Sequence, residues 1–246
     1  MLDFLFIGSV APVALLLWYI YRKDSIKEPR YMLFRAFCLG AVATLPILIA
    51  ELFFDVIFST DAEEVGSGLV LLISVFMGVG IIEEFFKWLI VRFACYNSKH
   101  FDESFDAIVY AVFVSLGFAA IENLMYVFTS VLSGFASTVL TIIARFVTAV
   151  PEHCFLGIIM GFFFAKAKKA QVQEKIIEEG IYILLGLFVP TILHTLYDYF
   201  LMASRLDLLV LWFLLAVTSL VVGIIVVKVS SKNNMVLVNR NNDNNW

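Results

Sequence analysis

Apolar stretches recur along the whole chain and are separated by short polar connections. A helix needs about 20 apolar residues to cross the hydrocarbon core of a bilayer. The alternating pattern of a membrane barrel is absent, and a backbone in lipid must satisfy its own hydrogen bonds. The pattern therefore predicts an all-α fold, a polytopic bundle of transmembrane helices. The seven predicted spans cover residues 2–21, 31–57, 68–94, 105–129, 136–165, 180–203 and 207–228.

The fifth predicted span is too long for one straight crossing and contains Pro151. Proline removes a backbone donor and kinks or ends a helix. We therefore expect either one kinked helix or two helices, which would give eight spans.

The composition agrees with this class of protein and adds few functional clues. Hydrophobic residues make up 62% of the 246 positions, and no segment has the composition of a separate soluble domain. We expect one transmembrane domain over residues 1–229 and a disordered, asparagine-rich tail over 230–246. The first apolar stretch lacks a basic start and a cleavage site, so we expect it to remain as the first span. The three cysteines have no metal-binding or disulfide spacing, and no basic aromatic patch suggests nucleic acid.

Lysine and arginine are divided unequally between the two sides of a seven-span path. Fourteen of the 17 lie in segments 22–35, 92–104, 166–175 and 228–240, all on one side, whereas only Arg205 lies in a connection on the other. Loops rich in these residues stay in the cytoplasm. We therefore expect a multi-pass protein of the cell membrane, with its N-terminus outside and its C-terminus in the cytoplasm.

The third span carries Glu83, Glu84 and Lys87 within five positions. Each charged side chain at the bilayer centre costs about 3 kcal/mol on insertion scales. Either glutamate can neutralise the lysine, because the spacings are i, i+4 and i, i+3. One glutamate then remains over, and a lone buried carboxylate suits general-base chemistry.

Further polar residues fall on the next three spans. Asp198 is four residues after His194 and is expected to hold its imidazole in one tautomer. Gly157 and Gly161 follow His153 on one helix face and would let another helix approach closely. Because ionisable residues in membranes face the bundle interior, we expect one polar cavity near the outer half of the bundle. Its expected members are Glu83, Glu84, Glu122, His153 and His194.

Other interpretations of these residues stay open. Glu122 and Asn123 could form a structural hydrogen bond between helices, and His153 could be a core histidine. Arg145 is expected to be structural, either paired with Glu152 or reaching toward the membrane surface. An ion-coupled transporter would use the same carboxylates as a proton relay, although no internal repeat supports that function.

Four motifs occur in order on four separate spans, from about residue 80 to about residue 200. With them the chain resembles the PrsW family of intramembrane proteases, within the superfamily of CAAX-processing and bacteriocin-processing membrane proteases. It departs from CAAX-type members at Lys87 and Glu122, where those have arginine and histidine. The motifs are Glu83-Glu84-Phe85-Phe86-Lys87, then Asp106-x-x-x-Tyr110 through Gly117-Phe118-x-x-x-Glu122-Asn123-x-x-Tyr126, then Pro151-x-His153-x-x-x-Gly157, then His194-x-x-x-Asp198.

The resemblance implies a peptidase of the bacterial cell membrane, with the domain over 1–229 as its protease domain. The family makes the first, extracytoplasmic cut in a single-span membrane anti-sigma factor. A second intramembrane protease then acts, and an extracytoplasmic-function sigma factor is released. The expected partners are this substrate and the lipid bilayer, without nucleic acid. The expected catalytic residues are Glu83, Glu84, Lys87, Glu122, Asn123, His153, His194 and Asp198.

Two mechanisms remain open at this point. In the first, one glutamate of the pair activates water, the other pairs with Lys87, and Asn123 donates a hydrogen bond to the oxyanion. In the second, Zn²⁺ is held by carboxylates and histidines. The candidate ligands are Glu83, Glu122, His153 and His194, whose spacing is not the His-Glu-x-x-His motif.

Overall fold

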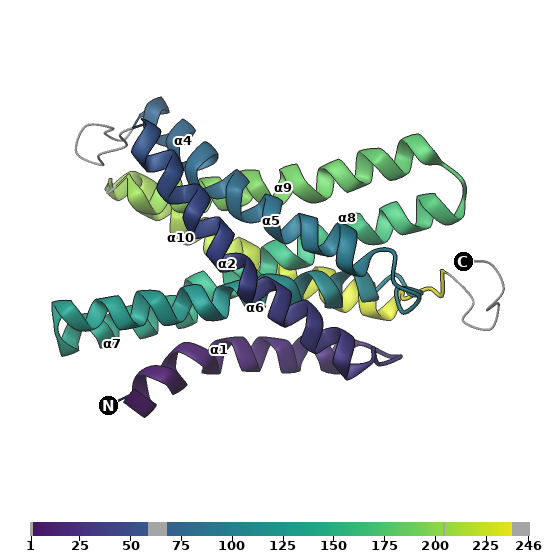
Figure 1. The fold of residues 1–246 in the computed structure, drawn as a ribbon, viewed down its shortest axis with the longest axis horizontal. Coiled ribbons are helices and arrows are strands. Elements are labelled where there is room, and N and C mark those ends of the chain that lie inside the picture. The colour runs from purple at the N-terminus through teal and green to yellow at the C-terminus, as the bar shows by residue number, and fades with distance from the viewer. Residues whose placement is uncertain (1, 59–67, 204, 238–246) are drawn as a thin grey trace.

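The computed structural model describes residues 2–58, 68–203 and 205–237, which form a bundle of long helices (Figure 1). Seven of the described helical stretches are long and apolar enough to cross a membrane. The described part contains no β-strand beyond an isolated bridge between Glu103 and Val236. The predicted all-α bundle of seven spans is confirmed. The tail is only partly covered, because residues 238–246 lie outside the described residues.

The spans follow the predicted order with small shifts at their ends. Helices α1 and α2 form the first two spans, α6 and the short η3 turn form the fourth, and α9 and α10 form the last two. The third and fifth spans are each built from several segments. The bounds are α1 Leu2–Lys23, α2 Arg30–Phe58, α4 Leu69–Val75, η1 Phe76–Gly80, α5 Ile81–Ile90, η2 Val91–Cys95, α6 Asp106–Ser130, η3 Val131–Ser133, α7 Phe135–Ala144, η4 Arg145–Ala149, α8 Val150–Val172, α9 Ile176–Met202 and α10 Leu206–Lys232.

The fifth span is one continuous helix of 38 residues, Phe135–Val172. Its middle segment, η4, is a π-helical turn directly before α8. Pro151 lies in the first turn of α8, where the changed hydrogen bonding of the π turn accommodates a missing donor. The alternative with eight spans is therefore not the observed one.

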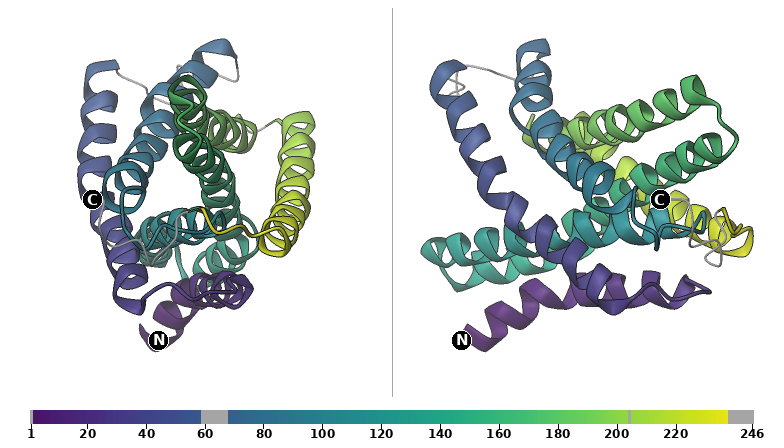
Figure 2. Two further views of the ribbon diagram at one scale, coloured as in Figure 1. Left: turned by 90° about the vertical axis from the view of Figure 1, so that its right-hand side faces the viewer. Right: turned by 45° about the vertical axis from the view of Figure 1, so that its right-hand side comes forward.

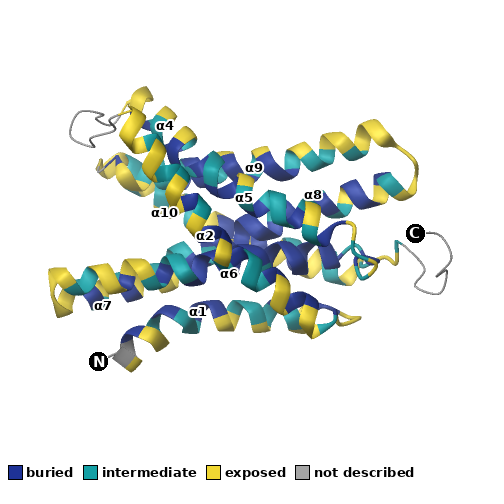
Figure 3. Cartoon of the chain, in the orientation of Figure 1, coloured by how far each residue is buried: buried dark blue, intermediate teal, exposed yellow. Residues whose placement is uncertain are grey.

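Helix α6 forms the axis of the bundle. In the most apolar stretch of the span that contains α6, 78% of the residues are buried, whereas the corresponding share for α10 is 17%. Figure 3 shows the buried residues gathered where α6, α5 and α8 cross. The predicted glycine face on α8 lies against α6, since a Cβ on Gly161 would be 2.5 Å from the Cα of Ile108. The right-hand view of Figure 2 shows α2 crossing α6 obliquely.

The connections fall into two groups at opposite ends of the bundle (Figure 1). The α1–α2, η2–α6 and α8–α9 connections lie at the end where α10 also finishes, and we call this the basic end. The N-terminus and the α6–α7 turn lie at the opposite end. At that turn Gly134 has φ +97°, a left-handed conformation that glycine adopts without steric cost.

The residues after the last span remain in contact with the basic end. Residues 230–232 still belong to α10. The side chain of Asn234 then accepts hydrogen bonds from the Ser104 hydroxyl and the Phe105 amide, both at 3.0 Å. The first part of the segment predicted as a disordered tail is thus placed against the loop before α6.

Candidate active site

Lys87 is the centre of a buried ionic cluster. Its Nζ donates to Glu83 Oε2 and to Glu84 Oε1, both at 2.9 Å. It also lies 4.1 Å from the centroid of the Phe118 ring, and the residue is 1% exposed. The prediction that the lysine would neutralise one glutamate and leave the other over is therefore corrected. The geometry allows both, because the i−4 and i−3 carboxylates reach the same ammonium.

His194 of α9 joins this cluster from the facing helix. Its Nδ1 lies 3.1 Å from Glu84 Oε1. Its Nε2 lies 3.3 Å from Asp198 Oδ2 and 3.9 Å from Glu83 Oε2. The expected contact with Asp198 is present, but the ring is held from its other side by Glu84 as well. Three carboxylates thus surround one buried imidazole.

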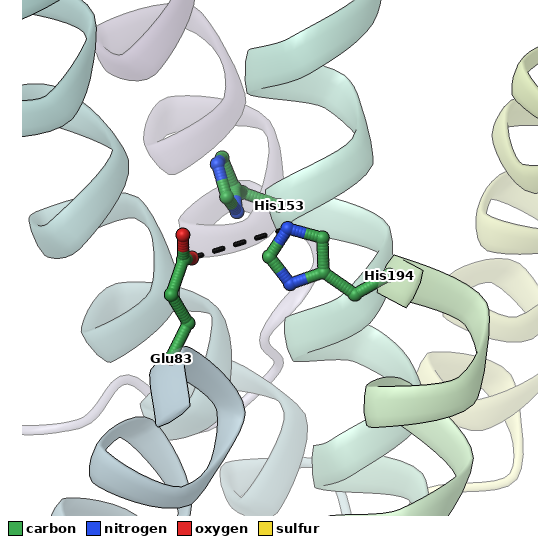
Figure 4. A group of neighbouring side chains, drawn as sticks. All are labelled: Glu83, His153 and His194. Atoms are coloured by element: carbon green, nitrogen blue, oxygen red, sulfur yellow. Dashed lines mark ion pairs between the residues drawn. The ribbon is translucent and has the colours of Figure 1, made fainter. Parts of the chain in front are cut away.

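His153 of α8 approaches from a third helix. Its Nε2 lies 2.8 Å from Glu122 Oε2, and its Nδ1 lies 3.4 Å from Lys87 Nζ. The ring centroids of the two histidines are 5.4 Å apart. In Figure 4, Glu83, His153 and His194 point toward one another from three different helices.

The expected pairing of Arg145 with Glu152 is not observed. Arg145 donates from Nη2 to Glu122 Oε2 at 2.7 Å and from Nε to Asn123 Oδ1 at 2.6 Å. It also lies 4.1 Å from the centroid of the Tyr126 ring. The π turn η4, in which Arg145 is the first residue, changes the angular phase of the helix, so the distance in sequence did not reveal this partner.

Asn123 is fixed by two hydrogen bonds. Its amide accepts from Arg145 and donates from Nδ2 to the backbone oxygen of Ser9 at 2.6 Å. One amide N–H is therefore used in helix packing and the side chain does not line the cavity, which makes Asn123 a residue that positions Arg145. Its expected role as an oxyanion donor has no support in this geometry.

A cavity of about 610 Å³ lies between these helices. Glu83, Glu122, His153, His194 and Asp198 all line it. Its rim reaches exposed side chains near the end of the bundle opposite the basic end, among them those of Tyr126 and Met202. Glu84, Lys87 and Asn123 are absent from the described lining and lie behind it. The expected residues thus divide into a group that faces the cavity and a group that supports it.

Two further carboxylates line the cavity. Glu51 of α2 is a lining residue that was not predicted, although a glutamate within an apolar span is a signal of a buried site. Glu152, expected as the partner of Arg145, is buried, and its Oε1 accepts no hydrogen bond from any described residue.

A close approach of helices brings the glutamates of α5 to the histidine of α9. Gly80 ends the π turn η1, and a Cβ there would lie 2.4 Å from Thr195 Oγ1. Small residues at helix crossings let backbones come together in membranes. Glycine at position 80 thus places Glu84 within hydrogen-bond reach of His194.

The site has a donor set that fits a metal ion. One ligand atom each from Glu83, His153 and His194 lies within 4.8 Å of the others. Two imidazoles and a carboxylate form the protein ligands of many catalytic zinc sites. Ligating histidines usually have their second ring nitrogen on a carboxylate, as seen here for His194 with Glu84 and His153 with Glu122. Glu122, another expected ligand, lies outside this group of three.

Comparisons with known proteins identify close relatives of the chain. Residues 28–227 match a family model described as PrsW family intramembrane metalloprotease. The chain is 36% identical over 194 residues to Protease PrsW of Oceanobacillus iheyensis, covering 79% of this chain and 81% of that protein. It is 35% identical over 201 residues to Protease PrsW of Bacillus subtilis, covering 80% and 82%. No solved structure gives a significant match.

Proposed function

Because the chain belongs to the PrsW family of intramembrane metalloproteases, we propose that it cleaves a membrane-anchored protein at the cavity described above. Membership of this family identifies the chain as a peptidase. The observation that carries the proposed site is the meeting of Glu83, His153 and His194, from three helices, on a cavity inside the bundle. The transporter alternative receives no support from the comparisons.

Glu83 is the proposed general base. It lines the cavity, whereas Glu84 lies behind it in contact with Lys87 and His194. A general base must reach the proton that it removes, and a water molecule in the cavity is accessible to Glu83 alone of the two. Lys87 donates a hydrogen bond to each of the two carboxylates, and Glu84 fixes the ring of His194.

The two histidines have different proposed roles: His153 stabilises the oxyanion of the reacting carbonyl, and His194 acts on the leaving amine. His194 has carboxylates at both ring nitrogens and is the proposed group that passes a proton to the amine. His153 is oriented by Glu122, and Glu122 is in turn held by Arg145. Asp198 is a second residue that orients His194.

A metal ion is compatible with the same residues. Glu83, His153 and His194 would hold it, with Glu84 and Glu122 orienting the two histidines. When bound, a divalent ion such as Zn²⁺ supplies Lewis-acid polarisation of the peptide carbonyl. In that case Glu51 and Glu152, the lining carboxylates that neither hold the ion nor orient a histidine, are the groups that can accept a proton.

The proposed substrate is a single-span anti-sigma factor in the bacterial cell membrane. The cavity opens toward the end opposite the lysine-rich and arginine-rich connections. By the distribution of these residues that end lies outside the cytoplasm, which supports a first, extracytoplasmic cut. Release of an extracytoplasmic-function sigma factor would follow from a second protease.

The test uses purified full-length protein and a single-span anti-sigma factor, reconstituted together in lipid vesicles. We expect one cut on the extracytoplasmic side of the substrate span, and no cut with Glu83→Gln. Glu178→Gln, which changes an exposed residue at the basic end, serves as the matched control. Normal cleavage by Glu83→Gln would refute the assignment of the base, and cleavage on the cytoplasmic side would refute the orientation.

A further inference from the structure

A second group of buried carboxylates lies at the basic end of the bundle, away from the cavity. It is formed by the α1–α2 connection, the loop before α6 and the first residue of α6. All five members are at most 3% exposed. They are Asp24, Glu28, Asp102, Glu103 and Asp106.

Asp106 is the centre of this group. Its Oδ2 accepts hydrogen bonds from the backbone amides of Glu103 at 2.7 Å and Asp102 at 3.1 Å. Its Oδ1 is buried and accepts no hydrogen bond from any described residue. The side chain is thus held by its own loop, while one oxygen points into the carboxylate group without a partner.

Asp24 repeats this arrangement from the other connection. Its Oδ2 lies 3.3 Å from the backbone amide of Glu28, and its Oδ1 is buried without a described hydrogen-bond partner. Asp24, Glu103 and Asp106 each offer a carboxylate oxygen within 4.8 Å of the others. Asp106 also belongs to a second such group, with Glu28 and Asp102.

Uncompensated carboxylate oxygens are costly to bury, because they lose their hydration without a replacement. Hard divalent cations bind oxygen ligands, mostly from carboxylates, carbonyls and water. Ca²⁺ takes about six to eight of them, and Mg²⁺ takes about six in octahedral geometry. The group offers oxygen donors alone, in contrast to the histidine-containing site in the cavity.

We infer that Asp24, Glu103 and Asp106, with Glu28 and Asp102 beside them, form a binding site for a hard divalent cation of the Mg²⁺, Ca²⁺ or Mn²⁺ class. The cation joins the α1–α2 connection to the start of α6. It also fixes the segment after α10, because Asn234 donates to Glu103 Oε2 at 2.6 Å and the Leu237 amide donates to the backbone oxygen of Asp102 at 2.6 Å. The site stabilises the basic end of the helix that forms the bundle axis.

The test measures thermal unfolding and metal binding of the full-length protein in detergent. After chelation, Mg²⁺, Ca²⁺ and Mn²⁺ are added back separately, and Tb³⁺ serves as a luminescent probe sensitised by Tyr110, whose hydroxyl donates to Glu28. We expect at least one cation to raise Tm by roughly 5 °C at a hundredfold excess over Kd. The cation that does so at the lowest concentration identifies the natural class.

Variants separate this site from the active site. Asp24→Asn and Asp106→Asn should lose the Tm increase and the Tb³⁺ signal, whereas Glu83→Gln and the exposed control Glu178→Gln should keep both. Asp24→Asn keeps the test decisive if Asp106→Asn fails to fold. The proposal is overturned if no cation changes Tm and Tb³⁺ gives no signal, since the carboxylate group would then bind no cation. It is also overturned if Asp24→Asn binds Tb³⁺ as wild type does.

Discussion

Replacing Lys87 by methionine removes the one ammonium that lies between the two glutamates. Lys87 is buried, donates two hydrogen bonds of 2.9 Å and contacts the Phe118 ring. Removing one partner of a buried ion pair costs about 3–5 kcal/mol, because the other charge stays buried without compensation. Two carboxylates lose the ammonium here and, of the described residues, only His194 remains paired with them, so the upper part of that range applies. Natural proteins are stable by only about 5–15 kcal/mol, and the loss is therefore a large fraction of the total.

The assay follows three quantities for each variant: the amount in the membrane, Tm in detergent, and cleavage of the reconstituted substrate. Lys87→Met should lower Tm by roughly 10 °C or more and abolish cleavage. Glu83→Gln should abolish cleavage but remain folded, since the amide oxygen still accepts from Lys87. Lys228→Met, at an exposed position of α10, controls for the loss of a lysine. If Lys87→Met matched wild type in Tm and activity, the ionic cluster would have neither the structural nor the catalytic importance assigned to it.

Three further outcomes are expected from the site and its supports. If Glu83, His153 and His194 hold Zn²⁺, a tight chelator should abolish cleavage and stoichiometric Zn²⁺ should restore it, whereas full activity of metal-free protein would leave activation of water by Glu83 as the mechanism. Arg145→Met should reduce kcat at least tenfold with little change in KM, because Glu122 is then free to leave His153; an unchanged kcat would show that the arginine only anchors the helix. Gly161→Val should prevent stable folding, since its first side-chain carbon would meet the backbone of Ile108, and a normal Tm would show that α8 can shift away from α6.

The seven spans could be predicted because each depends only on the length and polarity of its own segment. The meeting of Glu83, His153 and His194 could also be predicted, because isolated charges in lipid are too costly to leave apart. The partner of Arg145 could not, since the π turn before α8 changes the phase on which side-chain spacing rules depend. Glu51 was missed because it and Asp55 lie in the last two turns of the second span, where acidic residues are common and usually hydrated.

The carboxylate group at the basic end was beyond prediction for a different reason. Asp24 and Asp106 are 82 positions apart and lie at helix ends, where acidic residues are common and usually hydrated. Only the folding of two connections against α6 buries them together. Patterns within one helix are visible in a sequence, whereas contacts between loops depend on how the whole bundle packs.

The ion pairs of the cavity differ in how far apart their partners lie along the chain, and this sets an order for insertion into the membrane. Lys87 finds its carboxylates within its own helix, so the third span can leave the translocon already partly neutralised. Glu122 meets Arg145 only 23 residues later, beyond the turn at Gly134. Until that arginine has been synthesised, the fourth span carries a glutamate that costs about 3 kcal/mol in lipid. Helices α6 and α7 should therefore enter the bilayer together as a hairpin, and a nascent chain that stops before residue 145 should hold its fourth span at the translocon.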